Sequence, residues 1–408
     1  MTYRSLVGNA AAAVIFAMAF HTHAVEFSEL NETFGIPIWA DANLWDDRDV
    51  EVAQRLQWPP ESRTTSDSSF RIYTKSDTRV LGTRPFSMVM HGSEGSPDQI
   101  SMVFANKGDS SGPDEHGRPV DFNRLIAADT RAITDRLTAL LGPPGIDKFG
   151  QGQGTSERVS RWDWNGHTIL LAAPRGEYVA VRIVPTSAAD QETVTKLSDA
   201  ELREKLKARI IRRDNGDVLL GDIPMVDQGP KGYCVPATWE RALRYMGVPA
   251  DMYVLAMAGQ TKAGGGTNTT RMAGGASNLL QRHGRRLVTT GGRVSVRSVA
   301  RIIDEGLPIL WRMRVERETD RAVSERSALR RKATDWDEYK ESLKPVRREA
   351  RKIKTDPDNG HVCMIIGYNA DTQELAISDS WGPAYAERWI TIEEAEAIDQ
   401  REFMIVNW

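Results

Sequence analysis

The sequence predicts an α+β protein of two domains, and three observations support this prediction. The chain has 408 residues, well beyond the ~100–150 residues that are commonest for one domain. Short strand-like segments are mixed with helical segments. The character of the chain changes near Leu219, beyond which all the recognisable chemistry lies. We therefore expect an N-terminal α+β domain over residues 25–185, a connector over 186–218 that contains one helix, and a second domain over 219–408.

The composition excludes several classes of function. Lys and Arg number 53 and Asp and Glu number 56, so the formal net charge of -3 argues against a basic surface for nucleic acids. The hydrophobic share of 40% and the charged share of 27% are typical of a globular chain. Only two cysteines are present, which excludes a disulfide-dense scaffold, a thiolate-rich zinc ribbon and an iron–sulfur cluster. We expect no cofactor, no metal and no nucleic-acid partner.

Residues 1–24 have the pattern of a signal peptide. Arg4 precedes an apolar, alanine-rich run over residues 6–20, and the small residues that a signal peptidase recognises end at Ala24. The run is shorter than the ~20 apolar residues of a membrane-spanning helix. We expect cleavage near Ala24 and a secreted or periplasmic mature chain without an integral membrane segment.

The first domain is expected to combine helices with antiparallel strands. A helix over 47–57 stops at a Trp-Pro-Pro sequence, and a longer amphipathic helix ends at Gly142. Asn165-Gly166 between two alternating segments is the strongest short-range hairpin signal. Three further segments alternate like strands, over 69–74, 86–91 and 99–106. None of these segments carries a recognisable catalytic cluster.

The candidate nucleophile is Cys234. A loop rich in glycine and proline over 227–233 leads into a predicted helix that has Cys234 and Pro236 in its first turn and ends at Gly247. A sulfur at the positive end of a helix dipole favours the thiolate, which is the nucleophilic form. The alternative is a buried, inert cysteine, since free cysteine is among the most buried residue types.

The candidate general base is His361, and Asp379 is its expected partner. A predicted strand over 361–368 is followed by a polar turn and by a returning strand over 375–379. In an antiparallel hairpin centred near residue 370 or 371, His361 lies within a residue or two of Asp379. Cross-strand Cβ atoms are about 4.5–5.5 Å apart, close enough for a carboxylate to hold an imidazole N–H. None of the other histidines is paired with an acidic residue by comparable strand geometry.

These residues together resemble the papain-like cysteine peptidases. The resemblance rests on Gln228 with Cys234, on a glycine before His361, and on Asp379-Ser380-Trp381-Gly382, and it covers roughly residues 223–408. It implies a papain-like catalytic domain, with a helix carrying the cysteine and an antiparallel sheet carrying the histidine and the acid.

The resemblance also implies roles for the residues of the site. The Gln228 amide would donate to the oxyanion hole beside the backbone N–H of Cys234. Asp379 would orient His361 where papain-like enzymes have Asn, and Trp381 would shield that hydrogen bond from water. The Cys-Gly-Ser-Cys-Trp signature is absent, and the acidic third member is more similar to the bacteriocin-processing, double-glycine branch of the fold.

Three further features leave alternatives open. Gly264-Gly265-Gly266 is not followed by Gly-Lys-Ser/Thr, so it is either a flexible loop or a backbone segment that pairs with an extended substrate, as glycines do in the papain cleft. Cys363 is expected to pack behind the site, the alternative being a disulfide with Cys234. The charged segment 316–355 is expected to be a solvated helical hairpin, and the alternative is a lid or exosite for acidic substrate segments. Pro345 is expected to kink or end a helix of this segment.

The sequence thus predicts an exported, monomeric cysteine endopeptidase that acts on peptide or protein substrates. One alternative is an acyl transferase or transpeptidase that uses the same thioester chemistry, and another is an inactive papain-like binding module. The N-terminal domain remains a pro-region, a targeting module or a permanent partner. It lacks the long helices of a papain-type pro-segment, so pro-region is not the preferred role.

Overall fold

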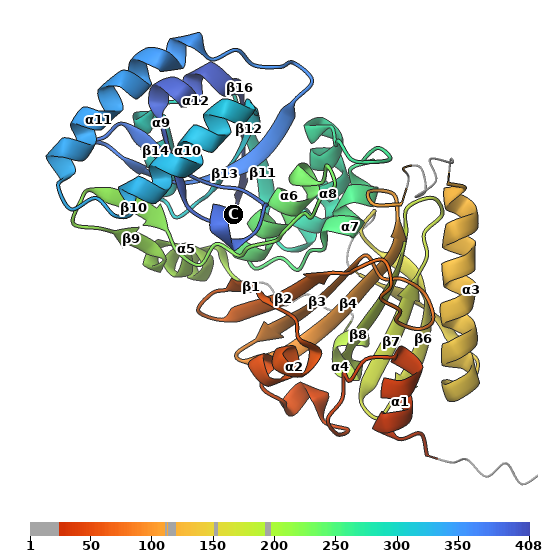
Figure 1. The fold of residues 1–408 in the computed structure, drawn as a ribbon. Helices are drawn as coiled ribbons and strands as arrows, with labels where there is room; N and C mark the ends of the chain where they lie inside the picture. Colours follow the sequence, from red (N-terminus) through yellow and green to blue (C-terminus); the bar gives the residue numbers. More distant parts are fainter. Residues whose placement is uncertain (1–23, 111, 113–119, 151–153, 192–196) are drawn as a thin grey trace, which may run out of the picture.

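The computed structural model describes residues 24–110, 112, 120–150, 154–191 and 197–408, and it is an α+β protein with one antiparallel sheet in each half of the chain (Figure 1). The predicted signal peptide, apart from Ala24, lies outside the described residues. Among the residues described, no helix has the length and apolar character that crossing a membrane requires.

The N-terminal sheet has eight strands in the order β1-β2-β3-β4-β8-β7-β6-β5. Its strands are β1 (Pro60–Arg63), β2 (Asp67–Tyr73), β3 (Ser87–Ser93), β4 (Ser96–Asn106), β5 (Gly145–Phe149), β6 (Glu157–Trp164), β7 (His167–Ala172) and β8 (Tyr178–Pro185). The helices α1 (Phe27–Phe34), α2 (Asp49–Leu56) and α3 (Phe122–Leu141) pack with one hydrophobic core on this sheet, together with a 3-10 turn, Leu44–Asp46.

Local sequence signals located most of this domain. The three strands expected over 69–74, 86–91 and 99–106 are β2, β3 and β4, and both predicted helices are present as α2 and α3. Asn165 and Gly166 have φ values of 43° and 79°, and Trp164 pairs with His167, as a two-residue type I′ hairpin requires.

The C-terminal sheet also has eight strands and is built around β13. Its main order is β11-β16-β12-β13-β10-β9, with β14 added to β13 and β15 added to β14. The strands are β9 (Ile210–Arg212), β10 (Asp217–Leu220), β11 (Arg286–Thr290), β12 (Ile309–Arg314), β13 (Gly360–Asn369), β14 (Glu374–Ser378), β15 (Arg388–Thr391) and β16 (Asp399–Asn407). The strand β13 thus has neighbours on both sides and lies in the middle of the core.

Nine α-helices follow β8 in the described chain, of which the first, α4, packs on β7 and β8 of the N-terminal sheet. They are α4 (Thr186–Ala189), α5 (Asp199–Ala208), α6 (Cys234–Tyr245), α7 (Met252–Ala258), α8 (Thr269–Arg282), α9 (Val296–Ile303), α10 (Arg317–Arg330), α11 (Trp336–Glu349) and α12 (Ile392–Ile398), with 3-10 turns at Ala350–Lys352 and Pro383–Tyr385. The one helix expected in the connector is α5, and it ends at Ala208, because the chain then forms β9. From α5 onward the predicted connector packs in the C-terminal core through Leu202 and Leu206.

The two halves share a hydrophobic core. Side chains of the N-terminal sheet such as Val103, Leu170 and Tyr178 cluster with Tyr233 and with α6 and α7, which lie between the two sheets (Figure 1). These apolar side chains are buried between the two halves, and their exposure to water would be unfavourable. The two halves therefore form one packed unit.

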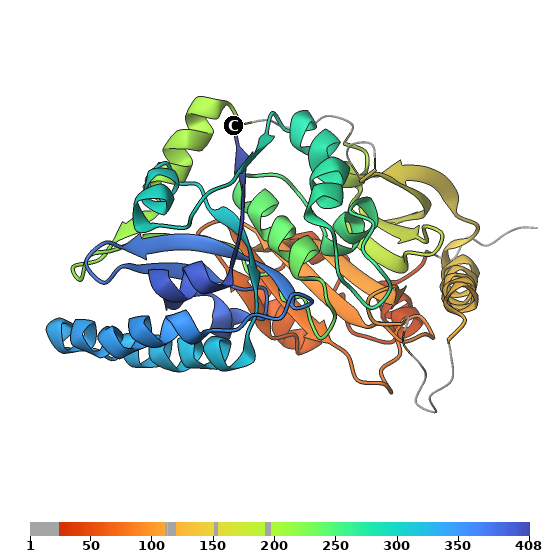
Figure 2. The same cartoon turned by 90° about the horizontal axis from the view of Figure 1, so that it is seen from above.

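The charged segment forms a helical hairpin, α10 and α11, beside the C-terminal sheet (Figures 1 and 2). Of the two effects expected of Pro345, a kink or the end of the helix, the end does not occur, because α11 continues to Glu349. Pro345 removes one backbone donor, but the buried Tyr339 and Leu343 hold the preceding turn, and Arg347 of the following turn donates to the Thr372 carbonyl at 2.5 Å.

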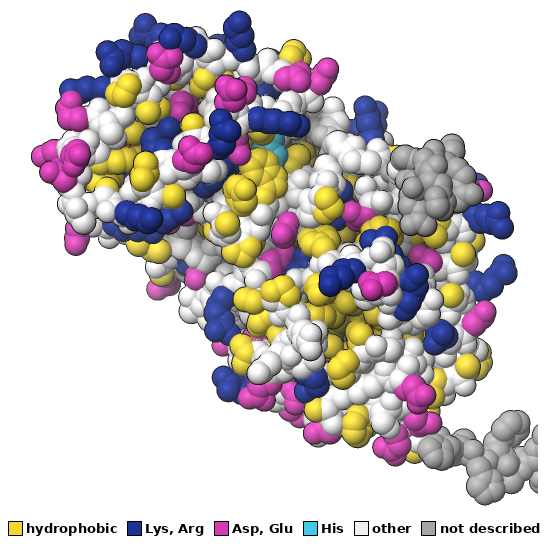
Figure 3. Space-filling model, viewed as in Figure 1, with side chains coloured by type: hydrophobic (Ala, Val, Ile, Leu, Met, Phe, Trp, Pro, Cys, Tyr) yellow, Lys and Arg dark blue, Asp and Glu magenta, His cyan; other side chains and the backbone are white. Residues whose placement is uncertain are grey.

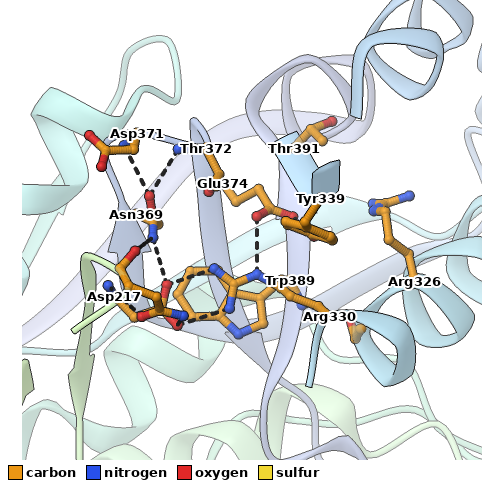
Figure 4. A network of polar contacts seen from close by, with 12 residues as sticks. Asp217, Arg326, Arg330, Tyr339, Asn369, Asp371, Thr372, Glu374, Trp389 and Thr391 are labelled. Atoms are coloured by element: carbon orange, nitrogen blue, oxygen red, sulfur yellow. Dashed lines mark hydrogen bonds and ion pairs between the residues drawn. The ribbon is translucent and has the colours of Figure 1, made fainter. Parts of the chain in front are cut away.

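A buried ionic network ties this hairpin to the sheet (Figure 4). Arg330 of α10 donates to both carboxylate oxygens of Asp217, at 2.6 and 2.9 Å, and to Glu374 at 3.1 Å. Its guanidinium lies 3.6 Å from the ring centroid of Trp389, and Tyr339 donates to the second Glu374 oxygen. One face of the expected solvated hairpin is therefore anchored, while its other face carries exposed charges.

Candidate active site

The helix α6 brings Cys234 against the central strand β13. Thr238, one turn into the helix, donates from its hydroxyl to the Val362 carbonyl at 3.0 Å. The backbone N–H groups of Val235 and Val362 both donate to the Cys234 sulfur. The residue as a whole is partly exposed, and its sulfur lies at the first turn of α6, the positive end of the helix dipole.

His361 and Asp379 meet as the strand register predicts. Ser378, the last residue of β14, pairs with Met364 of β13. The next residue, Asp379, therefore lies opposite position 363, two residues along β13 from His361. The distance between His361 Nε2 and Asp379 Oδ1 is 2.8 Å, and the two residues are 6% and 0% exposed. Since Nε2 is engaged, Nδ1 is the ring nitrogen that remains for the hydrogen bond between His361 and the Cys234 sulfur.

Trp381 covers this histidine. Its ring stacks on the imidazole of His361 with the centroids 4.6 Å apart and an interplanar angle of 29°. Tyr385 in turn meets Trp381 edge to face at 5.4 Å. The stack leaves little room for water beside the bond between His361 and Asp379, which strengthens the electrostatic part of that bond.

The three groups shift one another's protonation equilibria. Burial alone would lower the pKa of His361, but its hydrogen bonds to Asp379 and to Cys234, with both negative charges, raise that pKa to about 10. Burial alone would raise the pKa of Cys234, and the His361 hydrogen bond and charge hold it below its usual value instead. The pKa of Asp379 is likewise lowered, because His361 and Arg388 outweigh its burial. The arrangement favours a thiolate and an imidazolium at neutral pH.

Sequence reasoning missed Arg388, which holds the second oxygen of Asp379. The Arg388 Nη2 donates to Asp379 Oδ2 at 2.5 Å, and its Nη1 donates to Asp320 Oδ1 at 2.7 Å and to the Ser324 hydroxyl at 2.8 Å. Asp320 and Ser324 belong to α10, so the charged hairpin reaches the site through this arginine. The only sequence signal was an arginine at the start of the apolar strand β15.

A second buried arginine lies behind the site. Arg241 of α6 donates to the carbonyl of Ser378 at 3.1 Å, to its hydroxyl at 2.5 Å and to the Pro224 carbonyl at 2.8 Å. Burial without a directly paired carboxylate lowers the pKa of Arg241 to about 10, an effect that the charge of nearby Asp379 opposes. Two guanidinium groups therefore keep Asp379 in a positive environment.

Gln228 is fixed in one orientation. Its Oε1 accepts from the Ser380 hydroxyl at 2.8 Å, and its Nε2 donates to the Lys231 carbonyl at 2.8 Å. A carbonyl can only accept, so this contact defines which end of the amide carries the hydrogens. One of the two amide hydrogens is used, and the other remains for a second acceptor. The structure thus ties Gln228 to the segment that follows Asp379.

The glycine cluster lies against the loop that precedes the nucleophile. The N–H groups of Gly264, Gly265 and Gly266 donate to the carbonyls of Lys107, Lys262 and Gly232, at 2.9, 3.0 and 2.9 Å. A Cβ atom on Gly265 would lie 2.5 Å from the Gly232 Cα, so the close approach of the two chains requires glycine. Because these donors are engaged, backbone pairing of this cluster with a substrate would use its carbonyl oxygens.

The remaining predicted features lie apart from the reacting groups. Cys363 is a free, completely buried thiol, and burial raises its pKa well above the usual value. A cavity of about 1700 Å³ lies between the two halves and is not lined by Cys234, His361 or Asp379. Within the described ranges, no three His, Cys, Asp or Glu side chains are grouped so as to hold a metal ion. Basic and acidic side chains are intermixed on the viewed face (Figure 3).

Comparison with known proteins singles out the C-terminal half. Residues 220–404 match the family described as "Peptidase_C39 like family", a range that contains Cys234, His361, Asp379 and Gln228 and leaves out the N-terminal sheet. A search of curated proteins finds no match to the chain.

Proposed function

We propose that the chain is an exported cysteine endopeptidase, and the premise is the match of residues 220–404 to the Peptidase_C39-like family. The observation that carries the proposal is the continuous hydrogen-bonded series of Cys234, His361 and Asp379 on α6, β13 and the end of β14. In the proposed triad Cys234 is the nucleophile, His361 is the general base and acid, and Asp379 orients the imidazole.

Acylation begins from the thiolate. The Cys234 sulfur attacks the carbonyl carbon of a peptide bond, a C–S bond forms, and the carbonyl electron pair moves onto the oxygen. The backbone N–H of Cys234 opens α6, where helices have N–H groups without intrahelical partners, and it is one proposed donor to this oxygen. The remaining N–H of Gln228 is the other, and one such donor is worth about 10²–10³ in rate.

Collapse of the tetrahedral intermediate breaks the C–N bond and leaves a thioester. The leaving amine takes its proton from the His361 imidazolium, which becomes neutral. Water then attacks the thioester and gives a proton to the same ring, and the second collapse releases the carboxylate and restores the ion pair. Asp379 keeps Nε2 protonated throughout, so that Nδ1 does the proton transfer.

Export and the monomeric state are further parts of the proposal. Arg4 and the apolar run over 6–20 support a signal peptide, which would place the peptidase outside the cytoplasm, secreted or periplasmic. N-terminal sequencing of the exported protein tests this directly: a new terminus near Val25 supports processing, and an intact Met1 contradicts it.

The test of peptidase activity uses Cys234→Ala beside Cys363→Ala as the matched control. The purified proteins are incubated with a peptide library, and new termini are identified by mass spectrometry. We expect cleavage and labelling by a thiol-directed epoxide in the wild type and in Cys363→Ala, and neither in Cys234→Ala. Full activity in Cys234→Ala would end the proposal.

Added glycinamide separates hydrolysis from acyl transfer, because a transferase would yield amide-extended products. A wild type in which the Cys234 pKa is near the free value of about 8.5 would instead indicate an inactive binding module.

A further inference from the structure

We propose that the N-terminal domain is a permanent part of the active site, in which Tyr73 and Asp109 position the oxyanion loop, residues 227–233. This inference rests on the proposed peptidase function, because the loop carries Gln228 and leads directly into Cys234. The contacts come from β1 and β2 of the N-terminal sheet and from Asp109, just after the end of β4, and the family match includes none of these residues.

Two residues of that sheet hold the backbone of the loop at its first residue. The N–H of Asp227 donates to Glu61 Oε1 at 2.6 Å, and the carbonyl of Asp227 accepts from the Tyr73 hydroxyl at 2.5 Å. Just upstream, the N–H of Met225 donates to the Ser62 hydroxyl at 2.9 Å. Both polar backbone groups of the residue before Gln228 are therefore bound by side chains of β1 and β2.

A buried cation holds the middle of the loop. The Lys231 ammonium lies 3.2 Å from the Asp109 carboxylate and is enclosed by three tyrosine rings, Tyr73, Tyr253 and Tyr233, with centroids at 4.8, 5.2 and 5.6 Å. Its side chain is 1% exposed. A buried ammonium without a carboxylate partner is unfavourable, so the charge of Asp109 is what allows Lys231 to stay inside.

The position of Lys231 determines the position of Gln228. The carbonyl of Lys231 accepts the Gln228 amide at 2.8 Å, and this contact leaves the second amide hydrogen directed elsewhere. If the Lys231 side chain leaves its enclosure, the Lys231 carbonyl moves with it. The Gln228 amide then loses the acceptor that fixes its orientation. A donor that must reorganise during the reaction stabilises the oxyanion less than a preorganised one.

The surfaces also fit too closely for a removable pro-region. A Cβ atom on Gly108 would lie 2.6 Å from Lys231 and 2.8 Å from Tyr233, and one on Gly229 would lie 2.7 Å from the Tyr73 ring. Tyr233, the residue before the nucleophile, is 2% exposed within the core shared by both halves. Removal of the domain would open this core and uncover the Lys231 enclosure.

The experiment compares Asp109→Asn and Tyr73→Phe with Thr65→Val in the full-length protein. Each test variant keeps the size of its side chain and removes one charge or one hydroxyl. Thr65→Val is the matched control, because the Thr65 hydroxyl binds Asp222 at 2.7 Å across the same boundary, away from the oxyanion loop. Three quantities are measured: kcat and KM on a peptide, the rate of Cys234 alkylation by iodoacetamide, and the affinity of a peptide aldehyde.

We expect kcat to fall by about 10- to 100-fold in Asp109→Asn, with a smaller fall in Tyr73→Phe and KM within about twofold of wild type. Aldehyde affinity should fall in proportion to kcat, since its adduct places an oxyanion in the same position. Alkylation needs only the thiolate and should not change. The Thr65→Val protein should match wild type throughout.

Three results would overturn the inference: an unchanged kcat in both test variants, a change in KM alone, or equal losses of alkylation and turnover, which would indicate general loosening. If Asp109→Asn does not fold, Tyr73→Phe decides, because it removes a single oxygen and keeps the ring. A wild type that is alkylated at Cys234 yet cleaves no peptide contradicts the proposed function instead.

Discussion

The acidic residue at position 379 is predicted to be irreplaceable by Asn, although Asn is the residue of papain-like enzymes at this place. Asp379 accepts from His361 Nε2 on one oxygen and from Arg388 Nη2 on the other. An amide has only one oxygen, so in Asp379→Asn an N–H would face either the imidazolium or the guanidinium. The substitution thus creates a buried donor–donor contact in either orientation.

The structure gives the size of this effect. A pKa of about 10 for His361, in place of 6.5, corresponds to about 5 kcal/mol of preference for the imidazolium, at about 1.36 kcal/mol per pKa unit. Burial opposes this preference, and Asp379 and Cys234 together supply it. If Asp379 accounts for about half, its loss lowers the His361 pKa by roughly two, so the loss of imidazolium reduces kcat/KM by about 10²-fold above pH 10 and little near neutral pH.

The pH dependence has a definite sign. The His361 pKa is raised in the folded state, so the stability that it contributes is complete below pH 6.5 and is lost as the pH rises through about 10. Activity requires the imidazolium and should follow the same limit, with an alkaline limb near pH 10 in wild type and near pH 8 in Asp379→Asn.

The assay is the pH profile of kcat/KM, together with the pH profile of Cys234 alkylation. The double variant Asp379→Asn with Arg388→Gln is the compensating control, since a glutamine oxygen can accept from the new amide. It should recover part of the lost activity, whereas Arg388→Gln alone should lower activity, because Asp379 then loses the positive charge that Arg388 places beside it. A wild-type profile in Asp379→Asn, or no recovery in the double variant, would refute the reasoning.

Three further outcomes are expected. Iodoacetamide should modify only Cys234 in the native protein and should modify Cys363 as well in denaturant. Mass spectrometry counts the modified thiols, and two modified thiols in the native protein would contradict the burial of Cys363. Arg330→Met should reduce the free energy of unfolding in urea by about 3–5 kcal/mol, because Asp217 and Glu374 then remain buried without a cation, while the exposed Arg331→Met should change it little. Trp381→Ala should move the alkaline limb of kcat/KM down by about one pH unit, because water then screens the attraction between the His361 imidazolium and Asp379. An unmoved limb would show that the stack does not shield this bond.

Patterns within short stretches of sequence predicted much of the fold and the candidate site. The pairing of His361 with Asp379 followed from the lengths of two strands and the turn between them, since register in a hairpin is set locally. The helix that begins at Cys234 followed from the glycine- and proline-rich loop before it and from Pro236 in its first turn. In both cases neighbours along the chain carry the information.

Partners that are distant along the chain escaped prediction. Arg388 binds Asp320 across 68 residues, and Tyr73 binds the backbone of Asp227 across 154. Arg388 and Lys231 are long charged side chains, which are usually exposed, and no periodicity distinguishes a buried one. Their burial depends on a carboxylate contributed by another element, which a single sequence does not reveal.

The buried charges of the site form a series of alternating sign, and this order explains why the N-terminal domain and the α10–α11 hairpin both reach the site. The thiolate of Cys234 faces the imidazolium of His361, whose other side faces Asp379, and Arg388 then joins Asp379 to Asp320 of α10. Each charge inside depends on its neighbour, because an unpaired buried ion is costly. The N-terminal domain solves the same problem for Lys231 through Asp109. Without the hairpin, Arg388 would lose Asp320, and without the N-terminal domain, Lys231 would lose Asp109, so both additions complete the electrostatics of the site as well as its shape.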